Sequence, residues 1–122
     1  MADSWQVLMP KTQIFRSFTQ STGQAMALDP DRRTTLRLRA EFEDVGVDQA
    51  DLTIEVEEAV LNEETAFVAS GTAPVALGNN AATPNTQAVQ PLAFSGRFVR
   101  LKITANLNTT TWANIQAEVL VQ

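Results

Sequence analysis

The sequence contains no cysteine, no histidine and no tyrosine, and the first two absences remove whole classes of function. Without them there is no Ser–His or Cys–His nucleophile pair and no zinc site of the common kinds. The usual ligation of haem and iron–sulfur clusters is excluded as well. Carboxylates, hydroxyls, Lys11 and Lys102 remain for chemistry. We therefore expect a protein without enzyme activity, cofactor or resident metal.

Long apolar runs and an excess of basic charge are also missing. No stretch of about twenty apolar residues is present, so we expect no membrane-spanning helix. Acidic residues number 14 against 9 basic ones, and the net charge of −5 argues against nucleic acid as a partner. Residues 1–5 lack the basic and apolar segments of a secretory signal, which predicts synthesis in the cytoplasm.

The charges that are present are unevenly distributed along the 122 residues. Residues 41–64 include ten acidic side chains and no basic one, whereas residues 65–96 form a run of 32 residues without any charge. One interpretation is a solvated acidic face followed by polar loops. The other is that the uncharged run contacts another protein subunit, because the centres of interfaces are depleted in charge.

Two-residue alternation of apolar and polar side chains is the clearest structural signal. It covers residues 36–43 and 52–57, with Asp44 to Ala50 between them typical of a turn. We predict an antiparallel hairpin centred on Val47. Its register would place the following pairs opposite each other: Leu38 and Val56, Ala40 and Ile54, Phe42 and Leu52, Arg37 and Glu57, Arg39 and Glu55. A helix over residues 48–61 is the alternative for the second segment, and the β-branched residues there favour a strand.

The carboxyl-terminal third has the same alternation. Residues 97–105 and 112–121 predict two strands joined by a turn, and we expect them to form a second hairpin. Shorter apolar pieces precede them, and residues 78–91 suit a crossing between sheets. Together these segments predict an all-β, single-domain sandwich of the jelly-roll type with seven to eight strands, over residues 31–122. Residues 1–30 are less regular, and we expect an amino-terminal arm or edge strands.

Four side chains stand out as candidates for ligand contact. The large apolar faces of Trp5 and Trp112 are suited to stacking on sugar rings, and the guanidinium groups of Arg97 and Arg100 are suited to binding anions or sugar hydroxyls. The competing interpretation is core or edge packing for the tryptophans. For the basic group, which also includes Lys102, it is an ordinary outward strand face.

The acidic residues have two conceivable chemical roles, metal binding and hydrolysis. Calcium requires six to eight converging oxygens, and the spacing around Gly46 does not match an EF-hand loop, so we favour a solvated loop. The carboxylates considered for calcium are Glu41, Glu43, Asp44, Asp48 and Asp51. A glycosidase needs two carboxylates in different environments, and the candidates are Glu41, Glu43, Glu55 and Glu57. Glu55 and Glu57, however, alternate outward on a predicted strand and match arginines, which argues against this role.

The segment Ser95 to Ile103, followed by Trp112 and by Ile115 to Leu120, resembles the end of discoidin-like, galactose-binding jelly rolls. It is also similar to small β-sandwich proteins of bacteriophage heads and tails. The resemblance implies a jelly-roll fold and, as an alternative function, a carbohydrate-binding or adhesion module. Extracellular discoidin domains are longer and carry a disulfide and a signal peptide, so we take over the fold and keep glycan binding as the alternative.

The leading hypothesis is a structural protein that self-associates or decorates a larger assembly. A phage virion accessory protein, either capsid decoration or tail, fits the small domain, the uncharged segment and the missing catalytic residues. The expected partners are further copies of the chain or virion proteins, and the expected location is a virion or similar particle.

Overall fold

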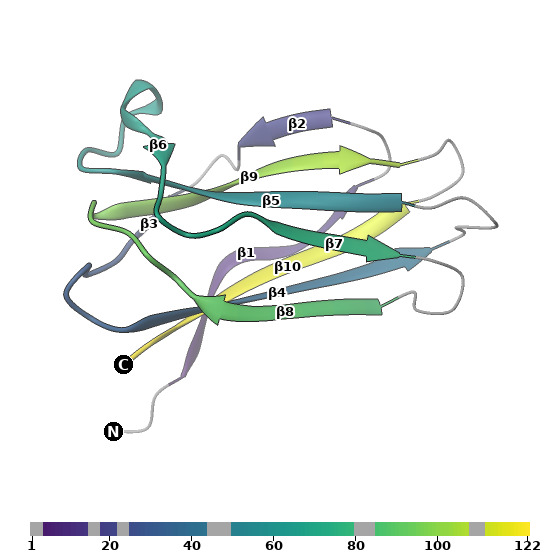
Figure 1. Cartoon of the computed structure of the whole chain (residues 1–122), viewed down its shortest axis with the longest axis horizontal. Coiled ribbons are helices and arrows are strands. Elements are labelled where there is room, and N and C mark those ends of the chain that lie inside the picture. Colours follow the sequence, from purple (N-terminus) through teal and green to yellow (C-terminus); the bar gives the residue numbers. More distant parts are fainter. Residues whose placement is uncertain (1–3, 15–17, 22–24, 44–49, 80–84, 108–111) are drawn as a thin grey trace.

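The computed structural model describes residues 4–14, 18–21, 25–43, 50–79, 85–107 and 112–122. Within them, two antiparallel sheets pack face to face as a β-sandwich (Figure 1). Ten strands are described, more than the seven to eight predicted, because two edges are divided into short pieces. The predicted all-β sandwich is confirmed.

The first sheet, called sheet A, has four strands. Their order across the sheet is β1 (Trp5–Ile14), β10 (Trp112–Val121), β4 (Thr34–Glu43) and β8 (Asn85–Pro91). Within the described chain, β1 and β8 each pair on one side only and are therefore the two edges of the sheet.

The second sheet, sheet B, is built around β9 (Phe98–Asn106) and β5 (Ala50–Ala59), which pair along their lengths. The short strands β2 (Phe18–Ser21) and β3 (Met26–Ala27) share the outer side of β9. On the outer side of β5 lie β6 (Val68–Ala69) and β7 (Val75–Asn79). A single 3-10 turn, η1 (Glu64–Ala66), lies between β5 and β6.

The hydrophobic core lies between the inner faces of the two sheets. Alternation sends every second side chain of the long strands into it, as predicted from the sequence. The fully buried members with the largest side chains are Leu36, Leu38, Leu52, Ile54, Leu101, Ile115, Val99 and Val119. The segment for which a helix was the alternative is the strand β5, so the prediction of a strand is confirmed.

Both predicted hairpins are wrong, although their strands are right. β4 pairs with β10 and β8 in sheet A, whereas β5 pairs with β9, β7 and β6 in sheet B. The segment predicted to pair with β10, β9, likewise lies in the other sheet. Alternation shows which face of a strand is buried, and two strands on opposite sides of the core satisfy it as well as two neighbours do. The turn residues 44–49 and 108–111 lie outside the described part of the chain.

The predicted cross-strand charge pairs change with the strand order. Arg37 lies opposite Glu118 of β10 rather than Glu57, and Glu57 lies opposite Arg100 of β9. Glu55 lies opposite Lys102. These charged side chains do point outward, but each of their partners comes from a strand distant in the sequence.

The uncharged region also differs from its prediction. The chain does cross from sheet B to sheet A between β7 and β8, which agrees with the expected crossing. Residues 85–91 are, however, a strand at the edge of sheet A rather than part of a connection. Residues 80–84 lie outside the described part of the chain.

A buried carboxylate fixes the turn between β8 and β9. Glu58 accepts hydrogen bonds from the backbone N–H of Ser95 (3.1 Å), the Ser95 hydroxyl (2.9 Å) and the N–H of Gly96 (3.1 Å). The backbone N–H of Arg97 donates to the carbonyl of Ala59 at 2.9 Å. A Cβ atom at Gly96 would lie 2.7 Å from that carbonyl oxygen, so the close approach of the two chains requires glycine.

Candidate functional site

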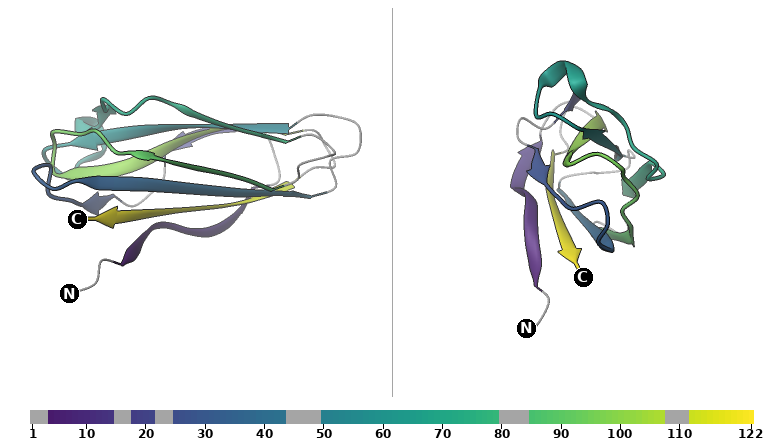
Figure 2. Two further views of the ribbon diagram at one scale, coloured as in Figure 1. Left: turned by 60° about the horizontal axis from the view of Figure 1, so that its bottom comes forward. Right: turned by 90° about the vertical axis from the view of Figure 1, so that its left-hand side faces the viewer.

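The described parts of the uncharged run, residues 65–79 and 85–96, form one side of the sandwich in the structure. They contain β6 and β7 at the edge of sheet B and β8 at the edge of sheet A, and we call this side the uncharged wall. In the end-on view of Figure 2, the purple β1 lies on one side and the teal-to-green segment on the other. Residues 65–79 and 85–96 therefore lie together at the edges of the two sheets, on the same side of the sandwich.

Hydrogen bonds between its two parts make the wall one unit. The hydroxyl of Thr72, before β7, donates to the carbonyl of Ala93 at 3.0 Å and accepts from its N–H at 2.8 Å. The amide of Gln90 on β8 donates to the carbonyl of Ala73 at 3.1 Å. These contacts join the edges of the two sheets, so that β7 and β8 keep a defined relation to each other.

Several small and apolar side chains of the wall are exposed to solvent. Val68 and Val89 are more than half exposed, and Val60 and Leu61 are exposed beside the wall, before η1. The smaller exposed members are Ala69, Ala73, Pro74, Ala76, Pro91 and Ala93. Low charge together with exposed apolar groups is the composition found at the centres of protein interfaces.

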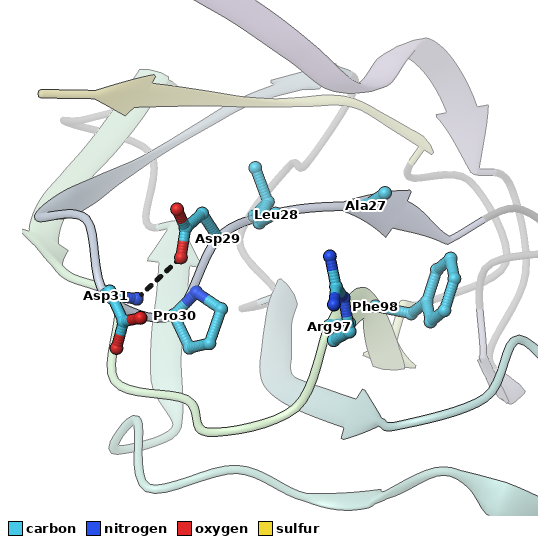
Figure 3. A pocket seen from close by; sticks show the side chains of 7 residues that line it. All are labelled: Ala27, Leu28, Asp29, Pro30, Asp31, Arg97 and Phe98. Carbon is cyan, nitrogen blue, oxygen red and sulfur yellow. Dashed lines mark hydrogen bonds between the residues drawn. The ribbon is translucent and has the colours of Figure 1, made fainter.

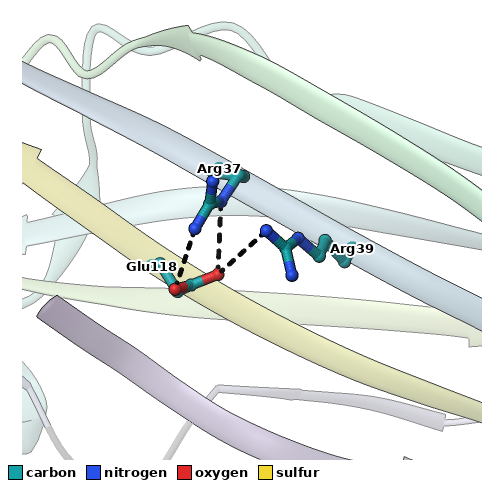
Figure 4. A network of polar contacts seen from close by, with 3 residues as sticks. All are labelled: Arg37, Arg39 and Glu118. Carbon is teal, nitrogen blue, oxygen red and sulfur yellow. Dashed lines mark hydrogen bonds and ion pairs between the residues drawn. The ribbon is translucent and has the colours of Figure 1, made fainter. Parts of the chain in front are cut away.

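The basic side chains of sheet A are engaged within the sheet rather than free for a ligand. Arg37 donates to both carboxylate oxygens of Glu118, from Nε at 3.2 Å and from Nη2 at 3.0 Å (Figure 4). Arg39 approaches the same carboxylate at 3.9 Å. Alternation of β4 and β10 places all three groups on the outer face of the sheet.

Trp5 and Trp112 do not form a joint site. The guanidinium of Arg37 lies over the Trp5 ring, 4.0 Å from its centroid, so this indole face already has a cationic partner. Trp5 lies opposite Leu120, whereas Trp112 is at the other end of β10. At a rise of about 3.4 Å per residue, the two rows are separated by about 27 Å.

Arg100 is a structural group in this fold. Its side chain is buried under η1 and donates to Glu57 at 3.0 Å and to Glu64 at 2.6 Å. Its guanidinium also lies 4.0 Å from the centroid of the Phe67 ring. The hydrogen bond and charge of Arg100 lower the pKa of Glu64, and the hydrogen bond to Glu64 raises the pKa of Arg100 despite its burial. Both groups stay charged near neutral pH, so Arg100 anchors η1 to β9.

Arg97, one of the four ligand-contact candidates, lines a pocket. The pocket has a volume of about 640 Å³ and lies beside β3 and the start of β9. Asp29 and Asp31 lie on one side of it, and Arg97 and Phe98 on the other (Figure 3). The turn of the acidic residues is held by the N–H of Asp31, which donates to Oδ1 of Asp29 at 2.9 Å.

The metal-binding and hydrolase hypotheses find no support in the part of the chain that the structure describes. Glu41 pairs with Lys11 at 3.3 Å, and Glu57 is bound by Arg100. Asp44 and Asp48 are not among the described residues, and neither are the side chains of Glu43 and Asp51. No group of three potential metal ligands occurs among the described residues.

Sequence reasoning missed two features of these surfaces. The pocket brings together Asp29 and Asp31 with Arg97, which lies almost seventy positions later in the sequence, and no local sequence pattern predicts this arrangement. The charge-free run was visible in the sequence, but its arrangement as one side of the molecule depends on the strand order.

No protein-family model matches the chain, and no curated protein matches its sequence. Among the described residues, no helix is both long and apolar enough to cross a membrane.

Proposed function

We propose that the protein is a non-enzymatic structural protein that self-associates or attaches to a larger assembly through the uncharged wall. The observation that carries the proposal is the wall itself, a surface without a charged residue on a chain whose 23 charges all lie elsewhere. A virion accessory protein of the capsid-decoration or tail type is the class that we propose.

The proposal is supported by the low free-energy cost of covering the uncharged wall with a partner protein. A charged side chain loses its hydration when a partner covers it, and an unpaired charge is costly to bury. Covering Val68, Val89 and the exposed alanines removes apolar surface from water and is favourable. The outer faces of both sheets, in contrast, carry charged side chains, among them Arg37 and Glu118 on sheet A and Glu55 and Lys102 on sheet B.

We also infer that the sandwich is a jelly roll. The support is the order of strands, β1-β10-β4-β8 in sheet A and β2-β9-β5-β6 in sheet B, with β3 sharing the β2 edge and β7 the β6 edge. The chain changes sheet between β1 and β2, β3 and β4, β4 and β5, β7 and β8, β8 and β9, and β9 and β10, as in two nested Greek keys. Jelly rolls occur in viral capsid proteins and in lectins, so this fold is compatible with both functions considered, and the surface must decide between them.

Self-association is tested by size-exclusion chromatography with light scattering over a concentration series. We expect oligomers in the wild type and weaker association after Ala76→Glu, which places a charge on β7 within the wall. The matched control is Ala27→Glu, an exposed alanine on β3 at the opposite edge of sheet B. Weaker association for Ala27→Glu alone, or a wild type that is monomeric up to about 1 mM, contradicts the proposal of self-association through the wall.

The pocket beside Arg97 favours a second candidate, a carbohydrate-binding or adhesion module. Carboxylates and a guanidinium hydrogen-bond to sugar hydroxyls, and the ring of Phe98 offers an apolar face at the same pocket. Neither tryptophan is among the residues that line this pocket, so tryptophan fluorescence is a poor reporter of binding there.

The direct test of this candidate is calorimetric titration with galactose, which the resemblance to discoidin-like domains suggests as a probe. We expect weak binding that Arg97→Ala removes and that Arg33→Ala, an exposed arginine outside the pocket, leaves unchanged. Absence of heat with the wild type, or equal loss in both variants, counts against the second candidate.

A further inference from the structure

The two edges of sheet A differ in how well they are protected from pairing with another strand. An open edge presents unpaired N–H and C=O groups, and natural proteins block such edges with proline, charge and bulges. β1 has all three, because it contains Pro10 and Lys11 and shows two register shifts, between Val7 and Met9 and between Met9 and Thr12. The β1 edge is therefore closed to strand addition.

The β8 edge has little such protection. Its seven residues, Asn-Thr-Gln-Ala-Val-Gln-Pro, include no charge, and their pairing with β4 runs without a register shift. Its one proline, Pro91, is the last residue and leaves the middle of the strand free. Within the described chain, β8 pairs with β4 alone. An unblocked edge of this kind is a template for a further strand.

The hydrogen bond that follows β8 shows which backbone groups face the open side. The N–H of Leu92 donates to the carbonyl of Thr34, which places residue 92 in a hydrogen-bonded pair with residue 34. Hydrogen-bonded and non-hydrogen-bonded pairs alternate along an antiparallel ladder. The even-numbered residues of β8 therefore bond to β4. The N–H and C=O groups of Gln87 and Val89 point away from β4, toward the open edge.

We propose that β8 pairs antiparallel with β8 of a second copy of the chain, across a two-fold axis, so that sheet A continues through both copies. This proposal rests on the proposed function, since it names the partner and the geometry of self-association through the wall. The outward N–H and C=O groups of Gln87 and Val89 make the hydrogen bonds. A two-fold contact uses the same patch on both copies, as this arrangement requires.

Charge is the reason for choosing a second copy as the occupant. Each copy carries a net charge of −5, so two copies repel each other over most of their surfaces. The uncharged wall is the side on which a second copy approaches without bringing like charges together. Pairing of β8 with β8 also aligns two edges of identical length and polarity and leaves the blocked β1 edges on the outside.

A matched pair of proline substitutions tests the hydrogen-bonded edge. Val7 and Val89 are 51% and 53% exposed and lie in one cross-strand row, Val7–Glu118–Arg37–Val89, at opposite edges of sheet A. The N–H of Gln122 donates to the carbonyl of Arg33, so even-numbered residues of β10 bond to β4. Glu118 therefore bonds to β4 and not to β1, so its partner Val7 is in a non-hydrogen-bonded pair and points its N–H away from β10. Proline therefore removes one outward N–H at either position and leaves the ladder of sheet A intact.

We expect Val89→Pro to weaken dimerisation by about tenfold or more, because the outward N–H and C=O of residue 89 lie at the centre of the new ladder. Val7→Pro should leave the dimer unchanged. Thermal unfolding of both variants reports whether the monomer still folds. If Val89→Pro does not fold, Val89→Lys, which adds an edge-blocking charge without touching the backbone, takes its place.

The geometry is measured independently with spin labels, because the chain has no cysteine of its own. Val89→Cys places a nitroxide next to the two-fold axis, where the paired strands are about 5 Å apart. Val7→Cys places it seven strand spacings from its counterpart, about 34 Å apart along the continuous sheet. A short distance from position 89 and a long one from position 7 support the pairing, and the reverse order overturns it.

The outcomes separate this inference from the proposed function. Association that Ala76→Glu weakens and that Val89→Pro leaves intact retains the wall as the contact and overturns the pairing of β8. Equal loss in Val7→Pro and Val89→Pro also overturns it. A wild type that is monomeric up to about 1 mM overturns both the pairing and the proposed self-association.

Discussion

Oε2 of Glu64, in the exposed 3-10 turn after β5, lies 2.6 Å from Nη1 of the buried Arg100 on β9. The carboxylate is 82% exposed, whereas the guanidinium is 8% exposed, so a surface residue completes the neutralisation of a buried cation. Together with Glu57, Glu64 neutralises Arg100, and these ion pairs hold η1 in place before β6 and the rest of the uncharged wall.

The pH dependence of this contact has a definite sign. Arg100 holds the pKa of Glu64 below its usual value of 4.5, so the folded state binds fewer protons than the unfolded one. The stabilisation of the folded state by the Glu64–Arg100 ion pair is therefore complete above pH 4.5, and it is lost as the pH falls through the folded-state pKa of Glu64. We expect Glu64→Gln to lower the melting temperature at pH 7, and the difference from the wild type to shrink below pH 4.5. A difference that grows in acid contradicts this assignment.

The ion pair between Arg37 and Glu118 should contribute more than the pair between Lys11 and Glu41. The first is 19% and 13% exposed and has two hydrogen bonds, whereas the second is 58% and 48% exposed. Glu118→Ala leaves a half-buried guanidinium without its main partner and should cost about 1–2 kcal/mol after allowance for solvent screening. Glu41→Ala should change stability by less than about 0.5 kcal/mol. Urea unfolding of both variants measures the contrast, and equal effects contradict it.

Two glycines provide a matched test of close packing. A Cβ atom at Gly96 meets the carbonyl oxygen of Ala59 at 2.7 Å, whereas one at Gly71 meets Cβ of Ala93 at an ordinary 3.6 Å. Gly96→Ala should therefore destabilise the protein by about 1–3 kcal/mol, by the cost of overpacking. Gly71→Ala should be nearly neutral. Thermal and chemical unfolding report both, and a neutral Gly96→Ala would show that the turn moves without cost.

The buried hydroxyl of Thr72 should stabilise the wall. It both donates to and accepts from the backbone of Ala93, and Thr72→Val removes both hydrogen bonds with little change in shape. The expected loss is about 1–3 kcal/mol, because the N–H and C=O of Ala93 lose this partner. Hydrogen exchange should show faster exchange of the Ala93 amide. The exposed Thr12 provides the comparison, since Thr12→Val removes only a local bond to Pro10.

The sequence predicted the strands better than their partners. Alternation in residues 36–43 and 52–57 identified the buried faces of β4 and β5, and the same signal identified those of β9 and β10. It could not show that each of these neighbours in sequence lies in a different sheet. The charged positions were likewise identified as outward, but Arg37 is bound by Glu118 rather than by Glu57.

For the candidate site residues, too, the sequence indicated their chemistry but not their partners in the folded structure. Arg100 was selected as a basic side chain on a strand, and only the position of η1 above it shows that it is an internal anchor. The tryptophans were selected for their chemistry, and the strand β10 places them at opposite ends. Arg97 remains at a pocket, whose acidic side chains, Asp29 and Asp31, come from a segment distant in the sequence.

The sequence alone determined which reactive groups the protein lacks. A chain without histidine or cysteine has no thiolate or imidazole in any fold, and residues 65–96 have no charge wherever they lie. The alternating pattern also sufficed for an all-β fold, because burial of one strand face is a local property. Only the tertiary structure decided that the uncharged run forms one side of the sandwich and that β8 is its unblocked edge. Strand order depends on which distant segments share a sheet, and that choice is made by packing across the core rather than by any local pattern.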